Sequence, residues 1–248
     1  KHNKLYFLVE PLEPEVMELI KGGKLPQGRI KKKDNEMVAL LREEADWDTK
    51  IAAKVKNVFE GNILIDETRG QVHIGEVIEM INDMLEDVMK AGPVAKEPCF
   101  GVKVRLMDMK LHEDAIHRGP AQMYPAVREG IRGAMMTAKP VIFEPIQTLR
   151  IEAPVENMGE ISKLVSSKRG QLLDMKQEED RIEVKAKLPV GEMFGLTSDL
   201  RSATEGRGVF FVVDQMFEQL PHELQSKISG QIRQRKGLKL VEGVAMSA

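Results

Sequence analysis

Three side chains that could bind a metal ion lie within six residues of one another. They are His112, Asp114 and His117, in segment 111–122, whose sequence is LHEDAIHRGPAQ. Imidazole and carboxylate groups are suitable ligands for zinc. In a helix only residues 114 and 117 would share a face, and in a strand only residues 112 and 114 would. Because no fourth ligand is evident either, we expect no metal site, and we expect Asp114 to shape a turn by hydrogen bonding to the backbone.

His117 occupies a position typical of the tip of a loop. It follows a segment with the alternation of a strand, lies beside Arg118 and Gly119, and precedes a predicted helix. Such a tip can enter a narrow groove of RNA, where shape and phosphate contacts matter more than base identity. A single histidine in a loop is also commonly an ordinary surface residue, and the residue types alone leave both interpretations open.

A second group of candidates is a basic run near the end of the chain. Between residues 227 and 239 there is no acidic residue. The run contains Lys227, Arg233, Arg235, Lys236 and Lys239. Such a patch can follow the phosphates of a nucleic acid with salt-dependent affinity. The alternative is a solvated helix face with no partner.

Motifs for bond-making chemistry are missing from the sequence. It has no Gly-rich loop ending in Gly-Lys-Ser/Thr, whose amides and lysine would hold nucleotide phosphates, and Asn3-Lys4 is not followed by an aspartate that would bind guanine. Gly-x-Ser-x-Gly, HExxH and paired CxxC motifs are missing too, and Cys99 has no nearby histidine. We therefore expect that this chain is not an enzyme, binds no cofactor and does not bind GTP.

Composition supports a globular protein that works by local contacts. The chain has 248 residues, 31% of them charged, yet its formal net charge is only −2, so any nucleic-acid contact must come from local basic patches. A single cysteine allows no disulfide within the chain, which fits a reducing cytoplasm. There is no secretory signal and no apolar run long enough to span a membrane. Because the chain begins at Lys1 with residues typical of a strand, we interpret it as a fragment of a longer protein.

The first part of the chain mixes strands and helices. Apolar patterns predict strands at 4–9, 62–65 and from 102 onward, and helices at 15–20, at 37–45, from an Asp48 cap through Val55, and at 77–89. A change of phase near Leu106 predicts a bulge, after which Met107, Met109 and Leu111 form the apolar set. A further helix is expected to have Pro125 near its first turn and a buried stripe of Val127, Ile131, Ala134 and Ala138.

The pattern changes after Pro145. Strands are predicted at 149–153, 173–175 and 182–188, helices at 158–165 and 194–204, and a buried strand at 209–213. The order βαββαβ is that of the ferredoxin-like fold. We therefore predict two domains, residues 1–145 and 146–248, with the terminal basic helix in the second and with the second able to fold alone.

Segment 111–122 closely resembles the loop of archaeal and eukaryotic elongation factor 2 that carries the modified histidine diphthamide. Other segments resemble the same family in the same order. Residues 2–6 (HNKLY) resemble the start of its domain IV, and residues 154–156 (PVE), 168–170 (KRG), 188–190 (LPV), 194–195 (FG), 199–201 (DLR) and 233–238 (RQRKGL) resemble its domain V. The resemblance covers nearly the whole chain, up to Leu240.

The resemblance implies an α+β chain, with a domain IV whose fold is also found in a small-subunit ribosomal protein and a ferredoxin-like domain V. It implies a role in translation elongation, as part of the GTPase that moves tRNA and mRNA through the ribosome. GTP and Mg would then bind in another part of the longer protein. The implied partners are the ribosome, tRNA, mRNA and the diphthamide synthesis enzymes, in the cytoplasm and with no membrane. A stand-alone ribosome-associated RNA-binding protein is the alternative.

By carry-over, His117 is the residue converted to diphthamide, and we expect it to be solvent-exposed while His112 braces the base of the loop. The residues implied to contact tRNA and mRNA are His112, Asp114, Ile116, His117, Arg118, Gly119 and Gln122. Those expected to contact rRNA are Lys227, Arg233, Arg235 and Lys236. Pro120 and Ala121 stand where eukaryotic members have glycines, which predicts a stiffer tip.

Overall fold

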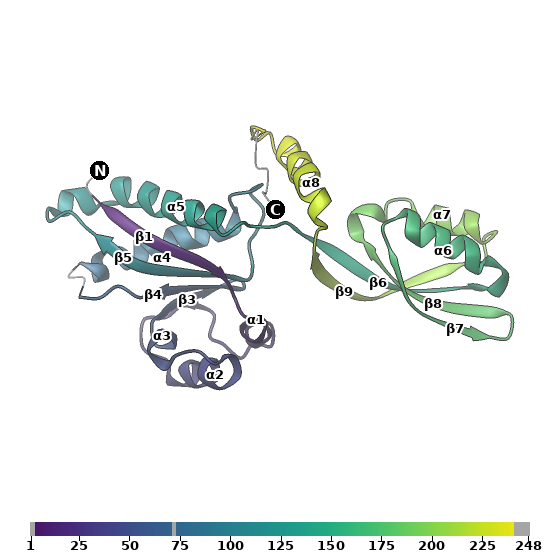
Figure 1. Cartoon of the computed structure of the whole chain (residues 1–248), viewed down its shortest axis with the longest axis horizontal. Helices are drawn as coiled ribbons and strands as arrows, with labels where there is room; N and C mark the ends of the chain where they lie inside the picture. The colour runs from purple at the N-terminus through teal and green to yellow at the C-terminus, as the bar shows by residue number, and fades with distance from the viewer. Residues whose placement is uncertain (1–2, 71–72, 241–248) are drawn as a thin grey trace. The chain divides into compact units, whose positions relative to one another are not determined.

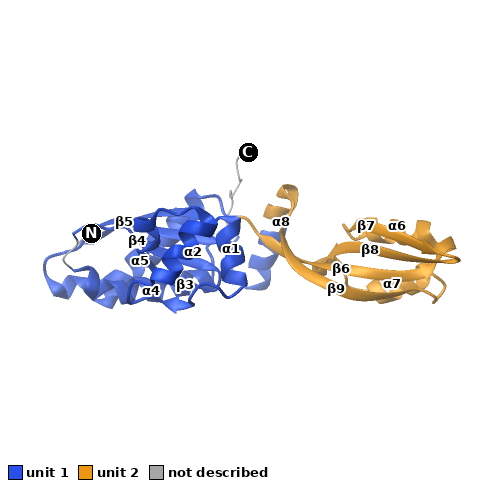
Figure 2. Ribbon diagram, turned by 90° about the horizontal axis from the view of Figure 1, so that it is seen from below, with its two compact units in different colours: residues 1–140, 228–248 blue, residues 141–227 orange. Residues whose placement is uncertain are grey.

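A computed structural model of the chain describes residues 3–70 and 73–240 (Figure 1). The fold is α+β and contains two sheets, as predicted. The chain divides into two compact units, shown in blue and orange in Figure 2. Unit 1 consists of residues 1–140 and 228–248, and unit 2 of residues 141–227. Within the described ranges, no helix combines the length and the apolar character needed to cross a membrane.

Unit 1 is built on a five-stranded sheet in the order β1-β5-β4-β3-β2. Its strands are β1 (Lys4–Pro11), β2 (Gly28–Arg29), β3 (Val55–Phe59), β4 (Asn62–Asp66) and β5 (Val102–Lys110). Its helices are α1 (Pro14–Lys21), α2 (Asn35–Ala45), α3 (Thr49–Ala52), α4 (Ile74–Lys90), the 3-10 turn η1 (Ala115–Arg118) and α5 (Pro120–Thr137). Strands β4 and β5 are parallel, and α4 makes the crossover between them that a parallel pair requires.

The sheet of unit 1 has a hydrophobic core on each face. Successive side chains of a strand point to opposite faces. On β4, Leu64 therefore packs with α4 and α5, whereas Ile63 and Ile65 pack with α1, α2 and α3. Figure 1 shows α4 and α5 on one side of the sheet and α1 to α3 on the other. Because both faces are covered, β4 is apolar throughout rather than alternating.

Unit 2 has the predicted βαββαβ order. Its four-stranded antiparallel sheet runs β7-β8-β6-β9. The elements are β6 (Phe143–Pro154), η2 (Val155–Asn157), α6 (Met158–Ser167), β7 (Gln171–Glu178), β8 (Arg181–Pro189), η3 (Val190–Glu192), α7 (Leu196–Ala203) and β9 (Val209–Gln219). Helices α6 and α7 cover the apolar side chains of β6 and β8. The alternation seen in segment 182–188 therefore follows from one covered and one open face.

Helix α8 (His222–Arg235) crosses the division between the units. Its residues from Ile228 onward lie with unit 1, although the prediction placed the whole helix in the second domain. The physical reason is hydrogen bonding: Arg233 donates to the carbonyl of Val94, and Lys236 donates to those of Ala95 and Lys96. The independent folding of residues 146–248 stays a prediction.

Three local predictions were wrong, and in two of them non-local strand pairing decided the outcome. The helix capped by Asp48 ends at Ala52, and Val55 instead begins β3, a strand that was not predicted, because it pairs with Ile65 of β4. Strand β9 lies at the edge of its sheet with β6 as its one neighbour, so Val212 and Val213, predicted to be buried, are about half exposed.

The third correction concerns α5. The helix begins at Pro120, which occupies its first turn, so Pro125 lies inside the helix. Its buried stripe is Met123, Val127, Ile131 and Met135, whereas Ala138 is exposed. The bulge predicted near Leu106 is confirmed, since Tyr6 and Phe7 pair with Asp108 and Leu106. Met107 is the extra residue of that bulge and is exposed, contrary to the predicted apolar set, whereas Met109 is buried.

An ion-pair network ties the short strand β2 to α4. The guanidinium of Arg29 donates to Glu79 (2.7 Å), Asp83 (2.7 Å) and Glu86 (2.9 and 3.0 Å), which lie on one face of the helix. The Tyr124 hydroxyl of α5 donates to Asp83 at 2.7 Å. Hydrogen bonds from Arg29 lower the pKa of both Asp83 and Glu86.

We expect an Arg29→Gln substitution to lower the free energy of unfolding of unit 1 by about 1–2 kcal/mol at neutral pH, since the carboxylates are only partly buried. Carboxylates with lowered pKa values stabilise the fold above their unfolded pKa near 4, and this contribution is lost as the pH falls through the folded pKa. The wild type should therefore lose stability below about pH 5, and the variant should lose less.

Urea unfolding followed by tryptophan fluorescence would measure this, because the single tryptophan, Trp47, is buried in unit 1. Arg42, which pairs with Glu43 on the surface, provides the matched Arg42→Gln control and should change stability by less than about 0.5 kcal/mol. If the free energy of unfolding fell by the same amount with pH in Arg29→Gln and in the wild type, the Arg29 network would not be the cause of the pH dependence.

Candidate functional site

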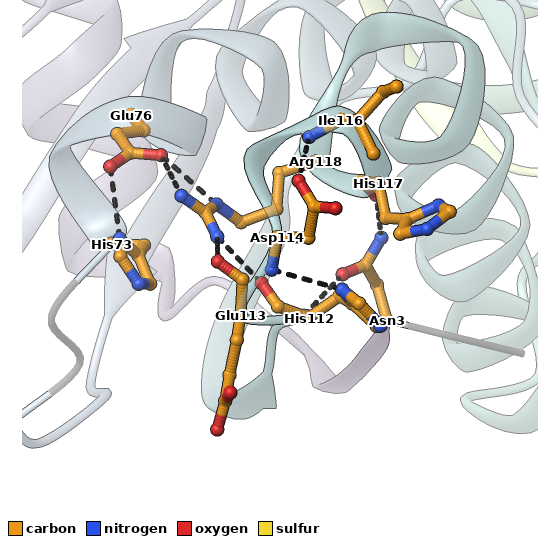
Figure 3. Close-up of polar contacts among 9 residues, drawn as sticks. All are labelled: Asn3, His73, Glu76, His112, Glu113, Asp114, Ile116, His117 and Arg118. Carbon is orange, nitrogen blue, oxygen red and sulfur yellow. Dashed lines mark hydrogen bonds and ion pairs between the residues drawn. The ribbon is translucent and has the colours of Figure 1, made fainter.

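The predicted tip loop is the connection between β5 and α5, residues 111–119. Its turn is made by Asp114, whose side chain accepts a hydrogen bond from the Ile116 amide at 3.1 Å and so caps η1. The Asp114 amide in turn donates to Nδ1 of His112 at 3.1 Å (Figure 3). The prediction that Asp114 shapes a turn is therefore confirmed. The imidazole of His112 acts here as an acceptor at Nδ1.

Asn3, just before β1, closes this loop. Its side-chain oxygen accepts from the His112 amide at 2.9 Å, and its side-chain nitrogen donates to the His117 carbonyl at 2.6 Å. The two contacts join residues 109 and 114 positions apart in the chain. They arise because β1 pairs antiparallel with β5, with Lys4 opposite Lys110, which places Asn3 at the foot of the loop.

Arg118 fills the inside of the loop. Its side chain is 6% exposed and donates to the carbonyl of His112 at 2.7 Å and to that of Glu113. It also donates twice to one carboxylate oxygen of Glu76, at 2.9 and 3.0 Å. Glu76 lies in the first turn of α4. Its other carboxylate oxygen is 2.9 Å from Nδ1 of His73 (Figure 3). Two hydrogen bonds lower the pKa of Glu76: the one with His73 has the larger effect, and the one from Arg118 the smaller.

The inward position of Arg118 corrects its predicted role. A guanidinium with these donors engaged inside the protein is not available to the phosphates of tRNA or mRNA in this conformation. Its place in the structure is that of a brace, which links the first half of the loop to α4. The sequence-based assignment failed because an arginine at a loop tip looks the same whether it points to solvent or inward.

The histidines differ slightly from the prediction. His117 is half-buried rather than fully exposed, because its ring packs edge-on against that of His112, with centroids 4.5 Å apart and an interplanar angle of 73°. The prediction that His112 braces the base of the loop is confirmed by its contacts to Asn3, Asp114 and Arg118. Of the other loop residues predicted to contact RNA, Asp114, Ile116 and Gln122 are exposed and Gly119 is partly exposed.

The outer surface of the loop is acidic and apolar. Glu113 and Asp114 are exposed, and Ile116 is 72% exposed. Arg118 is the one Lys or Arg in residues 111–119, and it is buried. The loop as folded therefore presents no fixed positive charge of its own to a nucleic acid. Within residues 3–70 and 73–240, no group of three His, Cys, Asp or Glu side chains is arranged to hold a metal ion.

The basic residues at the end of the chain divide into two kinds. Arg233 and Lys236 are engaged with unit 1: Arg233 donates to the carbonyls of Val94 and Lys239, and Lys236 forms an ion pair with Glu97 at 2.7 Å. Lys227 and Arg235 are exposed. The structure thus leaves these two as the better candidates for a phosphate contact among the four predicted residues.

Sequence reasoning missed Asn3, Glu76 and His73. Asn3 was considered only within a missing guanine-binding motif and as part of a resemblance, and Glu76 lies just before the predicted helix 77–89 and was given no role. No local signal could have found them, because each reaches the loop through the pairing of β1 with β5 or through the crossover helix α4.

Two family models match the chain in succession. The model described as Elongation factor G, domain IV matches residues 23–139, and the model described as Elongation factor G C-terminus matches residues 141–237. Relatives named Elongation factor 2 include those of Methanocaldococcus jannaschii (49% identical over 97% of the chain), Nanoarchaeum equitans (46% over 97%) and Pyrococcus furiosus (45% over 96%). The chain spans about a third of the length of these relatives, 33%, 33% and 32% respectively.

We expect an Arg118→Gln substitution to destabilise unit 1 by about 2–3 kcal/mol, because it leaves the carbonyls of His112 and Glu113 without their donor. Urea unfolding followed by Trp47 fluorescence would measure the change. The control is Arg128→Gln in α5, because Arg128 makes a surface pair with Asp87 and its loss should cost less than about 1 kcal/mol. Equal stability of Arg118→Gln and the wild type would mean that Arg118 is not a brace.

Proposed function

Because the chain belongs to the elongation factor 2 family, of which it carries domain IV and the carboxy-terminal domain, we propose that it is the part of a translocation factor that contacts RNA. The longer protein would hydrolyse GTP, with Mg, in a domain that lies outside this chain. The present chain makes contacts rather than bonds. Its partners would be the ribosome, tRNA and mRNA, and its place of action the cytoplasm.

The observation that supports this proposal best is the construction of the loop. A connection of nine residues is held from three sides, by Asn3, by Arg118 with Glu76, and by the cap at Asp114. Loops generally carry function when a rigid scaffold positions them. A braced loop with a half-exposed histidine suits a probe that enters the decoding site behind a moving tRNA and prevents its return. The contact residues we propose are His112, Asp114, Ile116, His117, Gly119 and Gln122, with Arg118 acting from inside.

We propose further that His117 is the residue converted to diphthamide, and the charge of the loop gives this a physical purpose. Glu113 and Asp114 would repel the phosphates of tRNA and mRNA. Diphthamide adds a long side chain with a quaternary ammonium group to the imidazole. It would therefore bring a fixed positive charge to a tip that has none on its surface, and extend its reach.

The alternative of a stand-alone RNA-binding protein is less well supported. Every relative named above contains the matched region as about a third of its length. We therefore propose that the chain works as part of a longer factor, in which unit 2 and α8 contact the large subunit.

The first step of diphthamide synthesis provides a direct test. It transfers an aminocarboxypropyl group from S-adenosylmethionine to an imidazole carbon, so that a C–S bond breaks, a C–C bond forms, the ring carbon loses a proton and methylthioadenosine leaves. We expect the first archaeal enzyme of the pathway to transfer label from S-adenosylmethionine to His117, as mapped by peptide mass spectrometry. The His117→Asn variant should stay unlabelled. Label on His112 or His73 would place the site elsewhere.

A second test separates the two kinds of basic residue. Replacing Lys227 and Arg235 together by Gln should weaken binding to ribosomes and reduce the slope of log K against log salt concentration by about 1.5 for two lost phosphate contacts. The matched pair Arg233→Gln and Lys236→Gln should leave that slope unchanged, because these side chains are engaged within unit 1. Sedimentation with ribosomes at several salt concentrations measures both. If only the Arg233 and Lys236 variant had a reduced slope, these two residues would be the ones that contact phosphate.

A further inference from the structure

A single side-chain amide holds both ends of the segment that carries His117. The oxygen of Asn3 accepts from the amide of His112, and its nitrogen donates to the carbonyl of His117. The six-residue segment 112–117 is thereby closed on one planar group. Asparagine is suited to this, because it combines an acceptor and a donor on a short side chain, whereas aspartate has two acceptors and alanine has neither.

The ring of His117 is linked to the clamp through His112. The ring packs edge-on against His112, and the backbone of each histidine is held by the same Asn3. The His112 ring is itself restrained, since its Nδ1 accepts from the Asp114 amide. A shift of Asn3 would therefore move both partners of the ring contact.

The clamp differs in kind from the brace of Arg118. Arg118 binds the carbonyls of His112 and Glu113, which lie in the first half of the loop, and ties them to Glu76 of α4. Asn3 reaches across the loop to the carbonyl of His117 itself. Figure 3 shows the two on opposite sides, with Arg118 toward Glu76 and Asn3 toward His117.

We propose that Asn3 is a positioning residue for His117, which orients the imidazole for the enzyme that modifies it and for the RNA that it meets. The proposal rests on the proposed function, because orientation matters only if His117 is modified or makes contact. It also links the start of β1 to the loop: any change that displaces the first residues of that strand would disturb the tip. The positioning depends on both the acceptor oxygen and the donor nitrogen of the Asn3 side chain.

The test uses the full 248-residue chain with Asn3→Ala and Asn3→Asp. Alanine removes both hydrogen bonds, so hydrogen exchange of the His112 amide should accelerate about tenfold and labelling of His117 by the first diphthamide enzyme should slow about tenfold. Aspartate keeps an acceptor for the His112 amide but places an oxygen against the His117 carbonyl. It should therefore preserve protection of the His112 amide while still slowing the labelling.

The Asn3→Asp variant separates positioning from general damage, because a merely structural defect would change exchange and labelling together. Asn35→Ala, an exposed asparagine in the first turn of α2, is the matched control and should leave both unchanged. Equal thermal melting of the variants and the wild type would show that unit 1 remains folded.

The outcomes distinguish this inference from the proposed function. If the wild type is labelled at His117 and both Asn3 variants are labelled at the same rate, the positioning role is overturned while the modification site stands. If the wild type is not labelled, the modification proposal has failed. Hydrogen exchange alone then tests whether Asn3 holds the loop. Unchanged protection of the His112 amide in Asn3→Ala would overturn that role as well.

Discussion

A buried guanidinium is stable only when its charge is paired and its donors are satisfied, and Arg118 sets this condition for the tip of unit 1. It draws in two carbonyls of the loop and the Glu76 carboxylate. Once these groups are in place, the loop can no longer fold outward as an open coil. The position of α4, the path of the loop and the start of α5 are therefore coupled through one side chain.

That coupling depends on the sheet beneath it. Strand β5 lies between β1 and β4, so its end is the point at which the loop, the first residues of the chain and the crossover helix α4 come together. Cores on both faces of the sheet hold these elements in place. The Arg29 network adds a polar connection between the short strand β2 and Asp83 and Glu86, farther along the same helix α4. The scaffold is thus heavily tied where the site needs rigidity.

Rigidity and charge together support our proposal that the loop contacts RNA after His117 has been modified. Its surface carries Glu113, Asp114 and Ile116, and its arginine is occupied inside. A shape that can enter a groove without attracting phosphates would bind weakly and without specificity. A cationic extension placed on His117 would supply the attraction at a single point, while the brace keeps the shape. The basic run at the end of the chain is likewise divided: Lys227 and Arg235 are exposed, whereas Arg233 and Lys236 are engaged within unit 1.

What the sequence determined by itself was the set of local choices. The alternation in β8, the cap at Asp48, the bulge in β5 and the βαββαβ order of unit 2 all follow from neighbours close in the chain, so they could be predicted. The loop and its histidines were identified from residue types and from resemblance.

The tertiary structure decided which way the side chains face and what they touch. Arg118 points inward, β9 lies at an edge, Val55 joins a sheet and Asn3 closes a loop more than a hundred residues away. The physical reason is common to all four. Burial and hydrogen bonding of these groups depend on strand pairing, and pairing partners are set by the packing of the whole unit rather than by the residues on either side.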